Sequence, residues 1–215
     1  MKAWLAAALI IAAAACSSGV EPSPADSNPI PRAVVLGDSL ALSPTTELNF
    51  TTELQARAQS AGLRLRISNA STWGDTTTDA LRRLEAALEG NPQILVVALG
   101  ANDGLRGVPV STVERNLGEI IARARGRRAR VLLTGMEAPP VSGFDYSIQF
   151  HLVFPRLAAQ HDISLVPFLL AGVVLNPDMN GPDLVHPNAA GARRIATTVW
   201  PYLEALVRQM SAAAA

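Results

Sequence analysis

Three residues that together could activate a serine nucleophile for hydrolysis stand in two distant parts of this chain. Ser39 lies in the run Gly37-Asp38-Ser39-Leu40, whereas Asp183 and His186 lie three residues apart near the C-terminus. A serine hydroxyl is a weak nucleophile until a base takes its proton, and histidine titrates near neutral pH. An aspartate beside the histidine would hold its tautomer and stabilise the imidazolium. These residues predict a Ser-His-Asp hydrolase, with an ordinary turn residue as the alternative role of Asp183.

The elements that must position these residues are indicated by five short apolar runs. They cover 33–36, 63–67, 94–99, 131–133 and 163–166. Continuous apolar runs are typical of strands buried on both faces, and helical patterns separate them. We therefore predict an α/β fold, a three-layer α/β/α sandwich with a central, mainly parallel, five-stranded sheet. Active groups in such sheets gather beyond the carboxyl ends of the strands, where these candidates would fall.

Two of the predicted helices begin with the spacing of a capping box. Thr76 with Asp79 forms the first, and Ser111 with Glu114 forms the second. Four arginines close the second helix: Arg123, Arg125, Arg127 and Arg128. We interpret them as a solvated helix end favoured by the helix dipole, with an anion-binding patch as the alternative.

Composition supports one compact domain. Apolar residues make up 49% of the 215, charged residues make up 17%, and the formal net charge is zero. A neutral chain argues against nucleic acid as a partner. We divide the chain into a signal peptide (1–15), a lipidated cysteine with a flexible linker (16–31), a catalytic domain (32–209) and a disordered tail (210–215).

The N-terminal residues indicate export. Lys2 precedes a short apolar stretch, 3–15, which is typical of a secretory signal, with a buried first helix as the alternative. Cys16 follows at once and resembles the acceptor of a bacterial lipoprotein. We expect a lipid anchor on Cys16 that holds the protein on a bacterial membrane, facing the periplasm or the exterior. Cleavage without lipidation would instead release a soluble periplasmic or secreted protein.

Several blocks of sequence, in order along 32–208, resemble the GDSL or SGNH hydrolase family. They lie at 35–40, 74–77, 100–107, 135–140, 166–168 and 183–191. The resemblance is strongest to the bacterial subgroup of arylesterases and thioesterase/lysophospholipase enzymes, and it implies a flavodoxin-like form of the predicted sandwich.

The resemblance also implies an activity and a role for each site residue. It implies a monomeric serine esterase that needs no cofactor or metal and acts on aryl esters, thioesters or lysophospholipids through an acyl-enzyme. Ser39 would be the nucleophile, His186 the base and then the acid, and Asp183 the residue that orients His186. The oxyanion hole would consist of the backbone N–H groups of Ser39 and Gly74 with the side-chain amide of Asn102. Three converging donors are what a tetrahedral intermediate requires.

Two alternatives to hydrolysis remain, namely acyl transfer at the same site and a catalytically silent surface-binding lipoprotein. The chain also departs from the family pattern in two places. Leu184 stands where the family usually has glycine after the catalytic aspartate, and Val141-Ser142-Gly143 stands where Asn-Tyr-Gly is common. We expect Leu184 to narrow the acyl pocket or to alter the turn between Asp183 and His186.

Overall fold

A five-stranded parallel sheet forms the centre of the computed structural model, which describes residues 29–213. Its strands are β1 (Arg32–Gly37), β2 (Arg66–Asn69), β3 (Ile94–Ala98), β4 (Arg130–Thr134) and β5 (Ser164–Val166). Their spatial order is β2-β1-β3-β4-β5, and every neighbouring pair is parallel. The predicted α/β sandwich is confirmed, and its sheet is parallel throughout. The predicted signal peptide and most of the linker lie outside the described residues.

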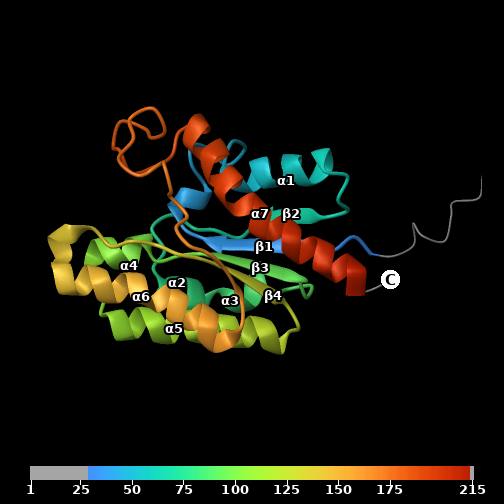
Figure 1. The fold of residues 1–215 in the computed structure, drawn as a ribbon, viewed down its shortest axis with the longest axis horizontal. Coiled ribbons are helices and arrows are strands. Elements are labelled where there is room, and N and C mark those ends of the chain that lie inside the picture. The colour runs from blue at the N-terminus through green and yellow to red at the C-terminus, as the bar shows by residue number, and fades with distance from the viewer. Residues whose placement is uncertain (1–28, 214–215) are drawn as a thin grey trace, which may run out of the picture.

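Helices cover both faces of the sheet (Figure 1). One face carries α1 (Phe50–Ser60) and α7 (Ala189–Ala213). The other carries α2 (Thr77–Arg82), α3 (Leu84–Ala87), α5 (Val110–Gly126) and α6 (Phe144–His161). Three short elements complete the fold: η2 (Ser39–Ala41), α4 (Ala101–Arg106) and η3 (Pro140–Ser142). Strand β3 is buried at all five positions, as expected for a central strand covered on both sides.

Several predicted boundaries are wrong, and each has a local cause. The second strand begins at Arg66 instead of residue 63. Leu65, which contributed to the apolar run, is buried in the segment before this edge strand and does not belong to the strand itself. The capping box of Thr76 and Asp79 is present, but its helix is interrupted at Arg83. The predicted capping box at Ser111 is absent, since α5 already begins at Val110 after Pro109.

The C-terminal helix is longer than predicted. It continues to Ala213, so the predicted disordered tail is wrong for residues 210–213. Buried side chains along one side of this helix, from Ile195 to Val207, pack on the sheet and support its length. Within the described part of the chain, no helix has both the length and the apolar character needed to cross a membrane.

The arginines that end α5 are largely engaged within the protein. Arg123 contacts Glu119 at 2.7 Å, and Arg127 contacts Glu85 at 2.6 Å. Arg125 donates to the carbonyl of His161 at 2.6 Å. These contacts favour the interpretation as a solvated helix end over that of an anion-binding patch.

Candidate active site

The five predicted site residues meet at one edge of the sheet. Ser39 follows β1, Gly74 lies in the connection after β2, and Asn102 lies in the first turn of α4 after β3. Asp183 and His186 come from the segment that leads into α7. Parallel strands place all their carboxyl ends at this edge, which explains how residues 147 positions apart come into contact.

Ser39, His186 and Asp183 form a continuous hydrogen-bonded chain. The imidazole Nε2 of His186 lies 2.9 Å from the Ser39 hydroxyl, and its Nδ1 lies 2.6 Å from Asp183 Oδ2. Ser39 is buried, whereas the imidazole is partly exposed. With the Nδ1 proton held by the carboxylate, Nε2 is the nitrogen free to accept the hydroxyl proton. This arrangement can therefore convert a serine hydroxyl into a nucleophile.

A tight turn holds Asp183 against His186. Asp183 Oδ1 accepts the backbone N–H groups of Val185 and His186, both at 3.0 Å. The imidazole contact, followed by these two N–H groups, holds the pKa of the Asp183 carboxyl well below its usual range. The turn requires a left-handed residue at Leu184, whose φ is 56°. That requirement explains why glycine would be favourable at this position.

The three segments of the expected oxyanion hole meet through Asn102. Its side-chain amide donates to the carbonyl of Asp75 at 3.0 Å and to the carboxylate of Asp38 at 3.3 Å. Asp75 directly follows Gly74, and Asp38 directly precedes Ser39. The Asn102 amide therefore donates to two acceptors, and its contact with Asp38 is the longer of the two.

Asp38 is a fully buried carboxyl group beside the nucleophile. It caps η2 by accepting the Leu40 N–H at 3.0 Å, which shapes the turn that carries Ser39. Burial is the largest influence and raises the pKa of Asp38 to about 6, against the opposing hydrogen bonds from Leu40 and Asn102. The pKa of Asp38 is thus higher in the folded state than in the unfolded state. Above about pH 6 the buried carboxylate is ionised and lowers the stability of the fold, and protonation restores that stability as the pH falls below this value.

Two arginines that are not among the predicted site residues, Arg83 and Arg106, stabilise this edge of the sheet through hydrogen bonds. Arg83, at the break between α2 and α3, contacts Asp75 at 2.5 Å and donates to the carbonyls of Gly37 and Ala70. Arg106 donates to the carbonyl of Gly74 at 2.9 Å. Arg83 lacks any motif in the sequence, so only the folded chain reveals that it joins the segments of β1 and β2.

Trp73 lies against the imidazole. The ring centroids of Trp73 and His186 are 5.3 Å apart, with the planes tilted by 47°. More than half of the indole remains exposed. Trp73 therefore packs against His186 with one part of its ring and leaves the rest in contact with solvent.

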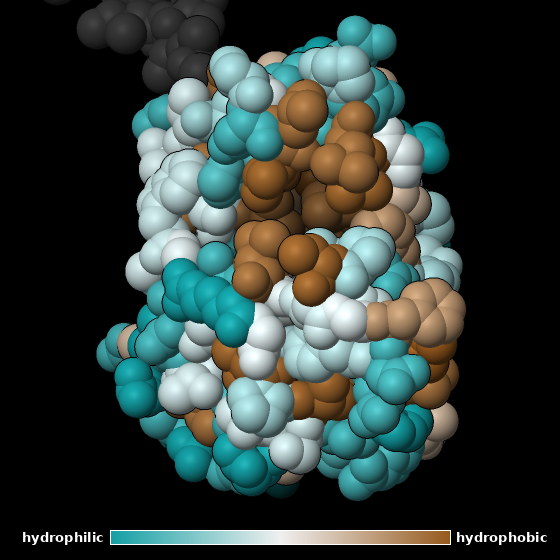
Figure 2. Space-filling view, turned by 90° about the vertical axis from the view of Figure 1, so that its left-hand side faces the viewer, coloured by the Kyte–Doolittle hydropathy of each residue, from teal (hydrophilic) through white to brown (hydrophobic). Residues whose placement is uncertain are grey.

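An apolar pocket of about 330 Å³ opens beside the triad. Its wall includes Leu40, which follows Ser39, and the two residues between Asp183 and His186, Leu184 and Val185. The remaining wall comes from α4, the segment after β4, and the segment after β5. Figure 2 shows apolar side chains gathered around a hollow on the face at this end of the sheet. A carboxylate, Glu137, is also present in the wall and is paired with His151 at 2.6 Å.

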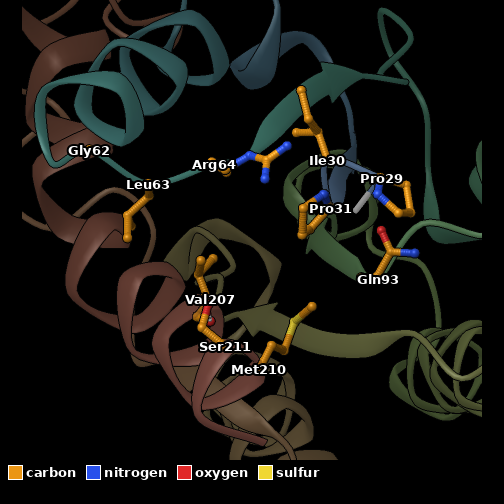
Figure 3. Close-up of a pocket in the computed structure, with 10 residues that line it drawn as sticks. All are labelled: Pro29, Ile30, Pro31, Gly62, Leu63, Arg64, Gln93, Val207, Met210 and Ser211. Atoms are coloured by element: carbon orange, nitrogen blue, oxygen red, sulfur yellow. Dashed lines mark hydrogen bonds between the residues drawn. The ribbon is translucent and has the colours of Figure 1, made fainter. Parts of the chain in front are cut away.

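A larger cavity, of about 590 Å³, lies at the opposite end of the sheet (Figure 3). Side chains of the segment before β1, the connection before β2 and the end of α7 surround it. Its ten lining residues include neither a carboxylate nor an imidazole. This cavity therefore lacks the carboxylate and the imidazole that the site at the carboxyl edge contains.

Comparison with known proteins agrees with this geometry. Esterase TesA of Pseudomonas aeruginosa is 40% identical over 177 residues, which cover 81% of this chain and 88% of TesA. Thioesterase 1/protease 1/lysophospholipase L1 of Escherichia coli is 33% identical over 181 residues, which cover 83% of this chain and 86% of that protein. The crystal structure of TesA superimposes with a TM-score of 0.77 at 39% identity, covering 81% of this chain and 99% of that one.

A second solved structure, the psychrotrophic esterase EstA from Pseudoalteromonas sp., matches with a TM-score of 0.78 at 28% identity. It covers 82% of this chain and 98% of that one. Residues 35–194 match the GDSL-like lipase/acylhydrolase family, a span that includes every site residue described above. The chain therefore belongs to the GDSL-like lipase/acylhydrolase family and is a hydrolase of acyl esters.

Proposed function

We propose that the Ser39–His186–Asp183 chain is the catalytic triad of a serine esterase that prefers medium-length acyl groups. The observation that carries this proposal is the pair of contacts on His186, 2.9 Å to Ser39 and 2.6 Å to Asp183, beside an apolar pocket. Ser39 attacks the ester carbonyl while His186 takes its proton, and Asp183 stabilises the imidazolium. His186 then protonates the leaving alcohol, and the same groups activate water for deacylation.

The backbone N–H groups of Ser39 and Gly74, with the Asn102 amide, would stabilise the negatively charged oxygen of the tetrahedral intermediate. Asn102 already spans the segments that carry the other two donors. Its longer contact, 3.3 Å to Asp38, is the one that a developing oxyanion would share. These two contacts hold the Asn102 amide beside the segments of Ser39 and Gly74, the position from which it would donate to the oxyanion.

Replacing Asn102 with alanine should lower kcat by about 10²–10³-fold, with a smaller change in KM, because the lost donor acts mainly in the transition state. Steady-state kinetics on a p-nitrophenyl ester would measure this, with circular dichroism to verify folding. A rise in KM with kcat unchanged would instead make Asn102 a ground-state binding residue.

The preference for medium-length acyl groups follows from the size and lining of the pocket. At about 330 Å³ it lies near the lower end of ligand pockets, about 300–1,000 Å³, and it exceeds what an acetyl group can fill. Each methylene that leaves water for an apolar wall contributes about 0.8 kcal/mol, or about fourfold in kcat/KM. A p-nitrophenyl ester series should therefore rise about fourfold per methylene and then level off. A profile that falls steadily from acetate would contradict the acyl assignment of this pocket.

Replacing Leu184 with glycine should shift the preference toward bulkier acyl groups while the triad continues to work. The change relieves the left-handed backbone strain at Leu184 and removes an apolar side chain from the pocket wall. The measurement is kcat/KM for short and long acyl esters in both proteins. If the two profiles differ only by a common factor, Leu184 does not shape the acyl pocket.

Leu175→Gly is the matched control. Leu175 is also left-handed, with a φ of 57°, and also lines the pocket, but it lies outside the triad turn. Loss of activity on every ester in folded Leu184→Gly, but not in Leu175→Gly, would mean that leucine is needed to hold the turn between Asp183 and His186.

We also propose that the enzyme is exported and anchored to a bacterial membrane through lipid on Cys16. The short apolar stretch before this single cysteine supports the proposal. Wild-type protein should fractionate with membranes and Cys16→Ser should become soluble, while Ser17→Ala, a neighbouring control, should stay with membranes. Wild-type protein found wholly in the soluble periplasmic or secreted fraction would contradict lipidation, although export could still hold.

A further inference from the structure

Exposed apolar side chains continue outward from the mouth of the pocket. We define the apolar patch as Val141, Phe144, Ile148 and Leu152. Val141 is 91% exposed and Phe144 is 76% exposed, and both closely follow the prolines of the pocket wall. Transfer of these apolar side chains from water to an apolar environment would be favourable. The patch therefore indicates a surface that something covers.

Helix α6 carries apolar residues on two sides. Its inner side packs into the core through Phe150, Val153, Phe154 and Leu157. Its outer side bears Phe144, Ile148 and Leu152 at intervals of four residues, which places them in one line along the helix. Helical side chains lean toward the N-terminal end, here the end next to the pocket. The outer line thus extends the pocket's apolar rim along the helix.

The pocket wall also contains two exposed leucines whose backbone is left-handed. Leu175 is 71% exposed and adopts a left-handed backbone, as does the partly exposed Leu184. A left-handed backbone is unfavourable for leucine, and glycine would avoid this strain. Leu175 and Leu184 thus add exposed apolar area to the pocket wall.

Two charged side chains beside the pocket are engaged within the protein, and a third, the exposed Asp145, directly follows Phe144 on α6. Glu137 is paired with His151, and Arg106 donates to the carbonyl of Gly74. None of the four patch residues is charged. The surface thus combines apolar side chains with one acidic group, and it is continuous with the pocket that the proposed function assigns to the acyl chain. These features fit a lipid–water interface better than a charged macromolecule.

We propose that the apolar patch docks on a lipid surface, so that an ester passes from a membrane or micelle into the pocket without crossing bulk water. The inference deepens the proposed esterase function and rests on it for the substrate. Since the contact is apolar, docking should occur on zwitterionic phosphatidylcholine and should depend little on salt.

Binding to phosphatidylcholine vesicles by co-sedimentation tests the proposal. All proteins would be full-length and carry Ser39→Ala and Cys16→Ser, which removes turnover and the anchor. All of them share residues 1–28, so the comparison is between proteins that differ only at the substituted positions. Adding Val141→Ser and Phe144→Ser should weaken vesicle binding at least tenfold, because two large apolar contacts are lost. Ile30→Ser, an exposed residue at the opposite end of the sheet, should leave binding unchanged.

Activity separates this proposal from the proposed function. With Ser39 restored, the Val141→Ser/Phe144→Ser variant should hydrolyse water-soluble p-nitrophenyl acetate at the normal rate but lose at least tenfold on a micellar ester. No hydrolysis of any soluble ester by the wild type would refute the esterase function and leave the vesicle result to be judged separately. Equal vesicle binding by variant and wild type, or a dimer that the two substitutions dissociate, would overturn lipid docking.

Discussion

Replacing Ser39 with alanine should lower kcat for p-nitrophenyl esters by about 10⁵–10⁶-fold while the protein stays folded. In the proposed mechanism the hydroxyl oxygen of Ser39 forms the acyl-enzyme, and this oxygen lies 2.9 Å from Nε2 of His186. The turn around it depends on backbone groups and on the Asp38 cap, which alanine leaves in place. Thermal unfolding would verify the fold.

Ser71→Ala is the matched control for this prediction. Ser71 also follows a strand at the carboxyl edge, and its buried hydroxyl has no hydrogen-bond partner within residues 29–213. Its loss should change kcat less than threefold. Substantial turnover by folded Ser39→Ala protein would refute the assignment of the nucleophile.

Replacing Asp183 with asparagine should lower kcat by about 10⁴-fold. The amide can present an N–H to Nδ1 of His186 and favour the tautomer whose Nε2 carries the proton, so that Nε2 can no longer accept from Ser39. Asp178→Asn, an exposed aspartate of the same segment, should stay within twofold of wild type. A loss below tenfold in Asp183→Asn would indicate that another group orients His186.

Asp183 also predicts a direction for the effect of acid on stability. The pKa of its carboxyl is lower in the folded state, because His186 and two backbone N–H groups hydrogen-bond the ionised form. Its contribution to stability is therefore present above the unfolded pKa and is lost as the pH falls below it. Asp38 acts in the opposite direction near pH 6, so unfolding of the Asp183→Asn and Asp38→Asn variants should depend on pH differently.

The sequence was sufficient for the elements that local patterns specify. Apolar runs located the strands, and the rule that parallel strands share a carboxyl edge predicted that Ser39, Asn102 and His186 would meet. Asp183 and His186 are close in sequence, so their turn could be anticipated. The departure from the family's glycine at position 184 drew attention to this turn, but the left-handed backbone that Leu184 adopts is seen only in the structure.

Long-range contacts set the features that the sequence could not predict. Arg83 lies between α2 and α3 and contacts Gly37 at the end of β1 and Asp75 in the connection after β2. A lone arginine inside a helical pattern gives no indication of such contacts. The engagement of Asn102 by Asp38 depends on how two loops approach each other. The start of β2 was misplaced because the burial of Leu65 marks packing rather than strand pairing.

The most direct measurement is labelling of the active enzyme with a fluorophosphonate, followed by peptide mass analysis. The account predicts one covalent adduct per chain, on Ser39, that abolishes esterase activity in proportion to labelling and fails to form in His186→Ala. An adduct on another residue that tracks the loss of activity, or an active enzyme that the probe does not label, would contradict it.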